Sequence, residues 1–304
     1  MLDKGISRRR GCQLACISRS SFAYRPVIKD DTDMIEKIKT FSKAHPREGS
    51  IKAYKNLRRD GIVVNHKKVE RIWRENNLSV VVKRRQRRRG KGLERPVRPL
   101  YPNHVWTYDF MEDSCVNGRK LRILNIVDEF SRECIESYVD HSIPAKKVLE
   151  VLEFLFIVHG RPDFIRSDNG PEFVAKSVQQ WLNEQGTKTA YIEPGKPWQN
   201  GIGESYNSRL RDECLNMELF YGLKDSRVII EDYRWYYNGE RLHGGLGYVP
   251  PLEFKKQWLA KHEGNESGAL PLPPPSSQPN NQYEFDFVID CVPEVCCNLE
   301  KVLT

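Results

Sequence analysis

Long apolar runs are missing from this sequence of 304 residues. No run approaches the roughly 20 residues that a helix needs to span a bilayer. The N-terminus also lacks the apolar segment of a secretory signal peptide. We therefore expect no contact with a membrane and a cytoplasmic location. A hydrophobic fraction of 39% and a charged fraction of 30% are typical of a soluble protein with room for two domains and a tail.

Cysteine is present but shows no organised pattern. The eight cysteines are scattered and lack the spacing of a disulfide-rich secreted domain, so reduced thiols are expected. Cys12 and Cys16 are separated by three residues, and no second pair follows at the spacing of zinc ligands. The sequence therefore argues against a zinc site at the N-terminus.

Acidic residues are scarce in one stretch. The net charge is +8, and residues 83–98 hold nine basic residues against one acid. Such a segment is too charged to bury itself, and its charge favours a polyanionic partner. We interpret residues 83–99 as a basic linker that follows the DNA backbone. Its predicted DNA contacts are Arg84, Arg85, Arg87 and Arg88.

Three acids lie where a metal site could form. Apolar runs lead into Asp109 and Asp168, and Glu204 lies on a polar helix. Carboxylate oxygens suit Mg2+ and Mn2+. Three carboxylates brought together would repel one another unless cations lay among them. Taken singly, each acid could equally be a turn or surface residue.

The sequence motifs around these acids resemble those of a known family. The motifs are Trp106–Phe110, Ile126–Arg132, Arg166–Phe173, Pro194–Gly201 and Glu204–Leu215. They closely resemble the retroviral-integrase-like core of bacterial insertion-sequence transposases, most of all the second-frame (OrfB-type) product. The resemblance covers roughly residues 5–258. It implies a ribonuclease-H-like fold in which Asp109, Asp168 and Glu204 form the DDE metal site.

The resemblance also implies an activity and partners. The expected activity is DNA strand cleavage and strand transfer with two divalent ions, Mg2+ or Mn2+, held by the three acids. Asp109 would contact both ions. The expected partners are double-stranded DNA, further copies of this chain on that DNA, and the first-frame product of the same element. Such a protein would act at the nucleoid.

Helical patterns precede the linker. Residues 1–28 read as two short helices with Ser7 and Ser18 as N-caps, and they resemble the family's opening DNA-binding motif. Cys16 stands where the family usually carries Gly.

Residues 29–82 show a helix-turn-helix pattern whose third helix begins after Asn65. Basic residues on that helix are predicted to contact DNA, although they could form an ordinary solvated face: Lys67, Lys68 and Arg71.

Residues 100–262 have the order of a mixed five-stranded sheet with helices. Three apolar runs between residues 106 and 140 predict an antiparallel meander. A helix at 146–159, a strand at 164–166, a helix at 174–185 and a strand at 187–192 follow. This order is what a ribonuclease-H-like sheet requires. Residues 263–304 are rich in Gly, Pro, Ser and Asn at first and are predicted to be a disordered or unrelated tail.

Two further segments could touch DNA. Residues 194–201 form a loop rich in Pro and Gly, with Lys196 and Asn200 as the predicted contacts. The helix from Ile202 should place Glu204, Ser208 and Arg211 on one face, which would point Arg211 at a phosphate beside the metal site.

Two other functions remain open from the sequence. A nuclease of the same fold acting on RNA–DNA hybrids is disfavoured by the basic N-terminal region and by the spacing of Asp168 and Glu204. A catalytically inactive DNA-binding remnant or regulator is favoured by the unfamiliar tail. All three acids are present, so any loss of activity would have to arise elsewhere.

Overall fold

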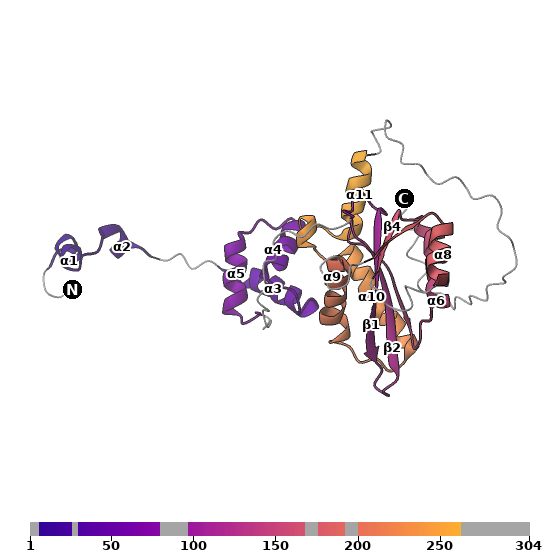
Figure 1. The fold of residues 1–304 in the computed structure, drawn as a ribbon. Coiled ribbons are helices and arrows are strands. Elements are labelled where there is room, and N and C mark those ends of the chain that lie inside the picture. The colour runs from indigo at the N-terminus through magenta and orange to yellow at the C-terminus, as the bar shows by residue number, and fades with distance from the viewer. Residues whose placement is uncertain (1–5, 26–29, 80–96, 168–175, 192–199, 263–304) are drawn as a thin grey trace. The chain divides into compact units, whose positions relative to one another are not determined.

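The computed structural model describes residues 6–25, 30–79, 97–167, 176–191 and 200–262 (Figure 1). Two short helices come first, α1 (Arg8–Leu14) and α2 (Arg19–Ala23). The Ser7 and Ser18 side chains accept hydrogen bonds from the Arg10 and Ser21 N–H groups, which confirms both predicted caps. Cys16, in the turn between them, has φ +53°, so this turn does use the left-handed backbone that glycine favours.

Three helices follow, α3 (Thr32–Ala44), α4 (Ser50–Arg59) and α5 (His66–Glu75). As predicted, Asn65 caps α5, its side chain accepting the Lys67 N–H. A small core joins the helices: Ile38, Ala53, Leu57, Val69, Ile72 and Trp73. These residues recur at helical spacing, which is why the pattern could be predicted from sequence.

The central sheet has the strand order β3-β2-β1-β4-β5. The strands are β1 (Val105–Ser114), β2 (Lys120–Asp128), β3 (Cys134–Asp140), β4 (Phe164–Ser167) and β5 (Lys188–Tyr191). β1, β2 and β3 pair antiparallel, whereas β1–β4 and β4–β5 pair parallel. The predicted meander and the mixed five-stranded sheet are thus confirmed.

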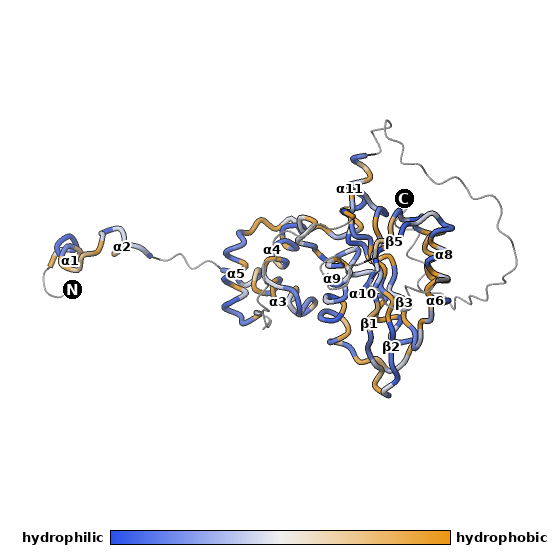
Figure 2. The backbone as a smooth tube through the Cα atoms, in the orientation of Figure 1, coloured by the Kyte–Doolittle hydropathy of each residue, from blue (hydrophilic) through white to orange (hydrophobic). Residues whose placement is uncertain are grey.

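Helices cover both faces of this sheet (Figure 1). α6 (Ala145–His159) and α8 (Lys176–Glu184) lie on one face and share a core with Trp106, Tyr108 and Leu124. α9 (Gly201–Leu210) and α10 (Leu223–Gly239) lie on the other. The strongly apolar tube of α6 in Figure 2 shows how much of that helix is hydrophobic. Both faces of the sheet are therefore buried against helices.

Short helical elements complete the chain. α9 continues as the π-helix η3 (Arg211–Leu215), and the 3-10 turn η4 (Gly244–Leu246) and α11 (Pro251–His262) follow α10. The predicted α-helical period from Glu204 reaches Arg211, whose N–H still bonds to the Asn207 carbonyl, and the backbone widens only in the turn that follows. None of the helices in the described ranges is long and apolar enough to cross a membrane.

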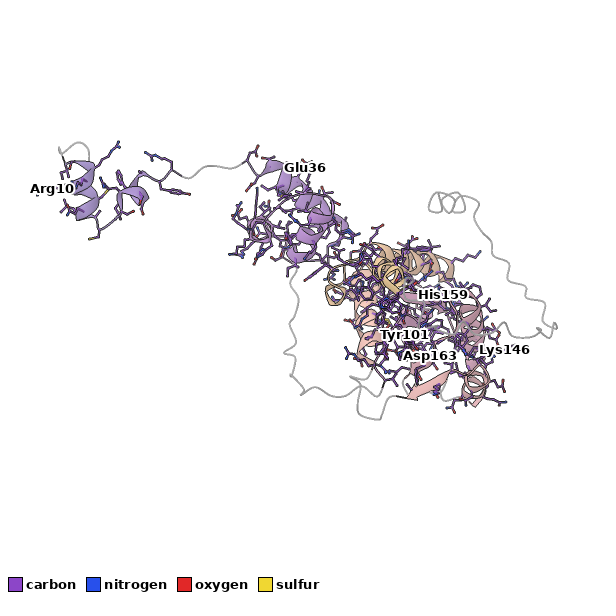
Figure 3. All side chains as sticks on the ribbon, turned by 90° about the horizontal axis from the view of Figure 1, so that it is seen from above. Arg10, Glu36, Tyr101, Lys146, His159 and Asp163 are labelled. Atoms are coloured by element: carbon purple, nitrogen blue, oxygen red, sulfur yellow. The ribbon has the colours of Figure 1, made fainter. Side chains whose placement is uncertain are left out.

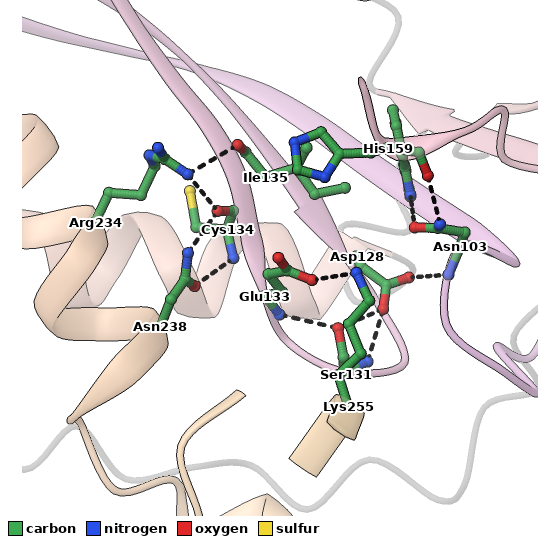
Figure 4. Close-up of polar contacts among 11 residues, drawn as sticks. Asn103, Asp128, Ser131, Glu133, Cys134, Ile135, His159, Arg234, Asn238 and Lys255 are labelled. Carbon is green, nitrogen blue, oxygen red and sulfur yellow. Dashed lines mark hydrogen bonds and ion pairs between the residues drawn. The ribbon is translucent and has the colours of Figure 1, made fainter. Parts of the chain in front are cut away.

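Polar side chains fix the ends of the strands. Asn238 of α10 accepts the Cys134 N–H and donates to the Cys134 carbonyl, both at 2.8 Å, so it binds β3 as another strand would (Figure 4). In the β2–β3 turn, Asp128 accepts from the Ser131 N–H at 2.8 Å and from the Asn103 N–H at 3.2 Å.

Before β1, Tyr101 donates to Asp163, and the two lie together in Figure 3. This bond raises the pKa of Tyr101 to about 12.

Candidate active site

Asp109 lies in the middle of β1, on the face covered by α9, and is half-buried. Its Oδ1 accepts the Phe110 N–H at 2.8 Å, and its Oδ2 accepts the Asn207 side-chain N–H at 2.8 Å. Asn207 follows Glu204 by three residues, less than one turn of α9. The bond therefore brings the part of α9 that carries Glu204 against Asp109.

Glu204 lies in the first turn of α9 and its side chain is exposed. The helix N-terminus favours a carboxylate there, because the unpaired N–H groups carry partial positive charge. Within the described residues no three His, Cys, Asp or Glu side chains gather closely enough to hold a metal ion. Asp168 lies outside those residues. It follows directly on Ser167, the last residue of β4, the strand that pairs with β1.

Gly203 allows α9 to approach β1. A Cβ at this position would lie 2.8 Å from Asn200 Oδ1 and 3.2 Å from Thr107 Oγ1. Thr107 donates a hydrogen bond to that same Asn200 oxygen, and both side chains are buried. The DNA contact predicted for Asn200 is untested, but here its side chain faces the protein and ties the start of α9 to the strand of Asp109.

A polar row crosses the sheet from Asp109. Asp109 on β1 pairs with Asn125 on β2, which pairs with Ser137 on β3. Asn125 donates to Asn207 Oδ1 at 2.8 Å, and Ser137 donates to Asn125 Oδ1 at 2.8 Å. The Tyr206 hydroxyl lies 2.8 Å from Ser137 Oγ. This row lies in an otherwise apolar core, where polar groups are tolerated only when hydrogen-bonded.

Arg211 contacts β1 at two points. Its guanidinium donates to Asp113 Oδ2 at 3.0 Å and to the Glu112 carbonyl at 2.6 Å. Asp113 is four residues beyond Asp109 on the same strand, so both side chains lie on the same face of the sheet. Arg211 thus lies along the strand from Asp109 and remains 40% exposed. A contact with DNA at this position stays a prediction.

The predicted DNA contacts on α5 differ in their surroundings. Lys67 is exposed. Lys68 and Arg71 both form ion pairs with Asp31, at 2.5 and 2.6 Å, and Arg71 also pairs with Glu75 at 2.8 Å. The remaining predicted contacts lie outside the described residues: Lys196, Arg84, Arg85, Arg87 and Arg88.

Charged side chains are also buried beside the candidate site. Arg166, on β4, donates to both carboxylate oxygens of Glu129 at 2.7 and 2.8 Å and to the Val97 carbonyl at 2.6 Å. Arg166 is 1% exposed and Glu129 fully buried. This pair, in which one guanidinium nitrogen contacts both carboxylate oxygens, holds β4 to the turn after β2, two residues before Asp168.

Sequence reasoning missed Asn125, Ser137, Asn207 and Thr107. A signal for the first two was present, since Asn125 shares the inward alternation of Leu121, Ile123 and Val127. A polar residue at an inward strand position needs a partner, and that need points to a network. Asn207 carried no such signal, because its role depends on how α9 packs on the sheet.

Comparison with known families identifies the class of protein. An integrase core domain family matches residues 99–197, and a second integrase core domain family matches residues 185–251. An HTH-like domain family matches residues 29–87. The sheet and these matches define a protein with a ribonuclease-H-like integrase core preceded by a helix-turn-helix-like segment.

Comparison with individual proteins shows which family within this class the chain belongs to. A protein of insertion element IS407 from Burkholderia multivorans is 37% identical over 261 residues, which cover 84% of this chain and 92% of the relative. A protein of insertion element IS476 from Xanthomonas euvesicatoria is 34% identical over 270 residues, covering 88% and 77%. The transposase for insertion sequence element IS904 from Lactococcus lactis is 28% identical over 235 residues, covering 73% and 92%. The chain belongs to this family of insertion-sequence transposases.

Proposed function

We propose that this transposase cuts and joins DNA strands at Asp109, Asp168 and Glu204. The observation that carries the proposal is the 2.8 Å bond from Asn207 to Asp109, which brings the turn of α9 just after Glu204 against β1. Asp109 and Glu204 thereby reach one side of the sheet from two elements. Asp168 follows the strand that pairs beside β1.

The donor set fits hard divalent cations, because carboxylate oxygens are the ligands that Mg2+ and Mn2+ prefer. When bound, two such ions would lower the pKa of an attacking water or 3′-hydroxyl and stabilise the departing oxygen. Asp109, Asp168 and Glu204 would hold them. The chain's own groups fix the geometry: Asn207 orients the Asp109 carboxylate, and Gly203 and Thr107 set how closely α9 lies to β1.

DNA would be held by basic residues on both sides of the linker. Lys67, Lys68 and Arg71 on α5 would contact the duplex, with Lys68 and Arg71 exchanging Asp31 for phosphate. Arg84, Arg85, Arg87, Arg88 and Lys196 would add backbone contacts, and Arg211 would hold a phosphate near the acids. Further copies of this chain and the first-frame product of the same element would complete the assembly on DNA.

Neutral replacements of the acids test this function. We expect Asp109→Asn and Glu204→Gln each to abolish strand cleavage and strand transfer, because each removes a charged ligand. DNA binding should stay near the parental level. Glu112→Gln is the matched control, since Glu112 is an exposed acid that alternates with Asp109 to the other face of β1. Near-parental cleavage by Glu204→Gln would exclude the proposal.

A further inference from the structure

The polar row behind Asp109 has a fixed direction. An ionised carboxylate can only accept hydrogen bonds, so the amide N–H of Asn207 must be the group that faces Asp109. The Asn207 carbonyl oxygen then accepts from Asn125, and the Asn125 oxygen accepts from Ser137. Ser137 has used its only proton, so the Tyr206 hydroxyl must donate to it. Every donor in the row points toward Asp109.

Asn125, Ser137 and Tyr206 have almost no access to water that could replace a lost partner. Asn125 is 2% exposed, Ser137 6% and Tyr206 1%. Removing Ser137 takes away the donor to the Asn125 oxygen, whereas removing Tyr206 leaves Ser137 with Asn125 and with the Cys134 thiol at 3.3 Å. In a buried network the loss of one bond also weakens the bonds that remain.

The two ends of the row differ in burial and in the element that carries them. Asn207 belongs to α9 and is half-buried, whereas Asn125 and Ser137 belong to the central sheet. An Asn amide that met no partner could turn over and present its oxygen to Asp109, which would repel the carboxylate. Asn125 prevents this, because it can satisfy the Asn207 oxygen only in the observed orientation.

We propose that Asn125, Ser137 and Tyr206 are positioning residues that fix the Asn207 amide and, through it, the orientation of the Asp109 carboxylate toward a divalent cation. This inference rests on the proposed function, in which Asp109 is a metal ligand. The row would hold the ligand Asp109 through hydrogen bonds and would not itself contact the cation. Partners of this kind, when lost, weaken metal affinity or activity by about 10- to 100-fold in other proteins.

Two conservative variants of the full-length chain test the inference. Ser137→Ala and Tyr206→Phe each delete one hydroxyl and keep the rest of the side chain. We measure Mn2+ binding calorimetrically without DNA, and strand transfer separately. Both variants should lose about 10- to 100-fold in Mn2+ affinity and a similar factor in strand transfer. Measuring the metal alone separates positioning from any effect on DNA contacts.

Matched controls separate positioning from stability. Ser226 is also fully buried, and its hydroxyl donates to the Gly222 carbonyl. Tyr233 is a buried tyrosine whose hydroxyl donates to Glu213. Ser226→Ala and Tyr233→Phe should leave Mn2+ affinity within about twofold, since neither hydroxyl is part of the row. Equal losses in the controls, or parental Mn2+ affinity in folded Ser137→Ala and Tyr206→Phe, would overturn the inference.

Asp109→Asn distinguishes this result from failure of the proposed function. If Asp109→Asn binds Mn2+ and joins DNA like the parent, Asp109 is not a ligand and both proposals are wrong. If Asp109→Asn loses both properties while the row variants keep them, only the positioning role is wrong.

Discussion

Residues that are small or polar matter most where α9 meets β1. The large apolar residues of the two cores could be exchanged for others of similar volume at modest cost. Gly203 and Thr107 could not, because their contacts set the distance between an acid on a helix and an acid on a strand. At this scale the approach of α9 to β1 depends on small and polar residues rather than on the large apolar ones.

Gly203→Ala tests this statement. The added Cβ would lie 2.8 Å from Asn200 Oδ1, whose buried bond to Thr107 prevents it from moving away. We expect a loss of about 1–3 kcal/mol from overpacking, larger than the gain of about 1 kcal/mol that alanine brings to a helix. Strand transfer should fall as α9 is displaced. The measurement is urea unfolding together with the strand-transfer rate.

Gly239→Ala supplies the control for helix propensity. Gly239 ends α10, and a Cβ added there would meet no atom within 4 Å. The same substitution should therefore leave stability unchanged or slightly raised there. A Gly203→Ala protein that is both more stable than the parent and fully active would show that close approach is not needed.

Elements differ in how far the sequence predicts them. The α3–α5 helices and the β1–β3 meander follow from periods of 3.6 and 2 residues, together with caps such as Asn65. The π-helix η3 could not be predicted, because its widened turn is stabilised by tertiary contacts of Arg211 and Glu213 rather than by local preference. The acids of the site came from resemblance, whereas their supporting residues required the packed sheet.

β4 is the short strand that directly precedes Asp168, one of the acids of the proposed site. It has four residues, and its Arg166 is held by Glu129 in a buried ion pair. Removing one partner of a buried pair leaves a charge without compensation and costs about 3–5 kcal/mol, whereas replacing both partners with apolar groups is often close to neutral. The pair therefore makes the position of β4 depend on the turn after β2.

A double-mutant cycle measures that dependence. We expect Arg166→Met and Glu129→Leu each to lower the free energy of unfolding by about 3–5 kcal/mol, and the double variant to recover most of that loss. Urea unfolding of the four proteins gives the coupling energy. If the two single losses simply add in the double variant, the pair does not act as a unit.

At the scale of the whole molecule, a buried ionic cluster links distant parts of the sequence. Arg241 donates to both oxygens of Glu213 at 2.6 Å, and Tyr236 donates to Glu48 at 3.0 Å. Glu48 also pairs with Lys52. The cluster joins the start of α4, the π-helix that extends α9, and the end of α10 within the compact unit Met1–Ala260. The helix that carries Glu204 is thus held at its far end by charge.

His243 makes this cluster sensitive to pH. Burial, followed by the charges of Arg241 and Lys52, lowers the pKa of His243 to about 3. The folded protein therefore keeps His243 neutral where the unfolded chain, with a pKa of about 6.5, takes up a proton. The stability that results is fully present above pH 6.5 and is lost as the pH falls toward 3. Burial opposes a low pKa at Glu213, but Arg241 lowers it, so the contribution of Glu213 changes mainly below its unfolded pKa of about 4.3.

Between pH 6.5 and 4.5 the change in the free energy of unfolding that is due to His243 can therefore be measured apart from that of Glu213. We expect the free energy of unfolding of the parent to fall more steeply across this window than that of His243→Phe, by up to about 1.4 kcal/mol per pH unit. His159, whose pKa burial lowers, and Asp128 and Glu136, whose pKa values burial raises, titrate alike in both proteins. Their effects cancel in the difference. If the His243→Phe curve runs parallel to that of the parent, the cluster is not the source of acid sensitivity.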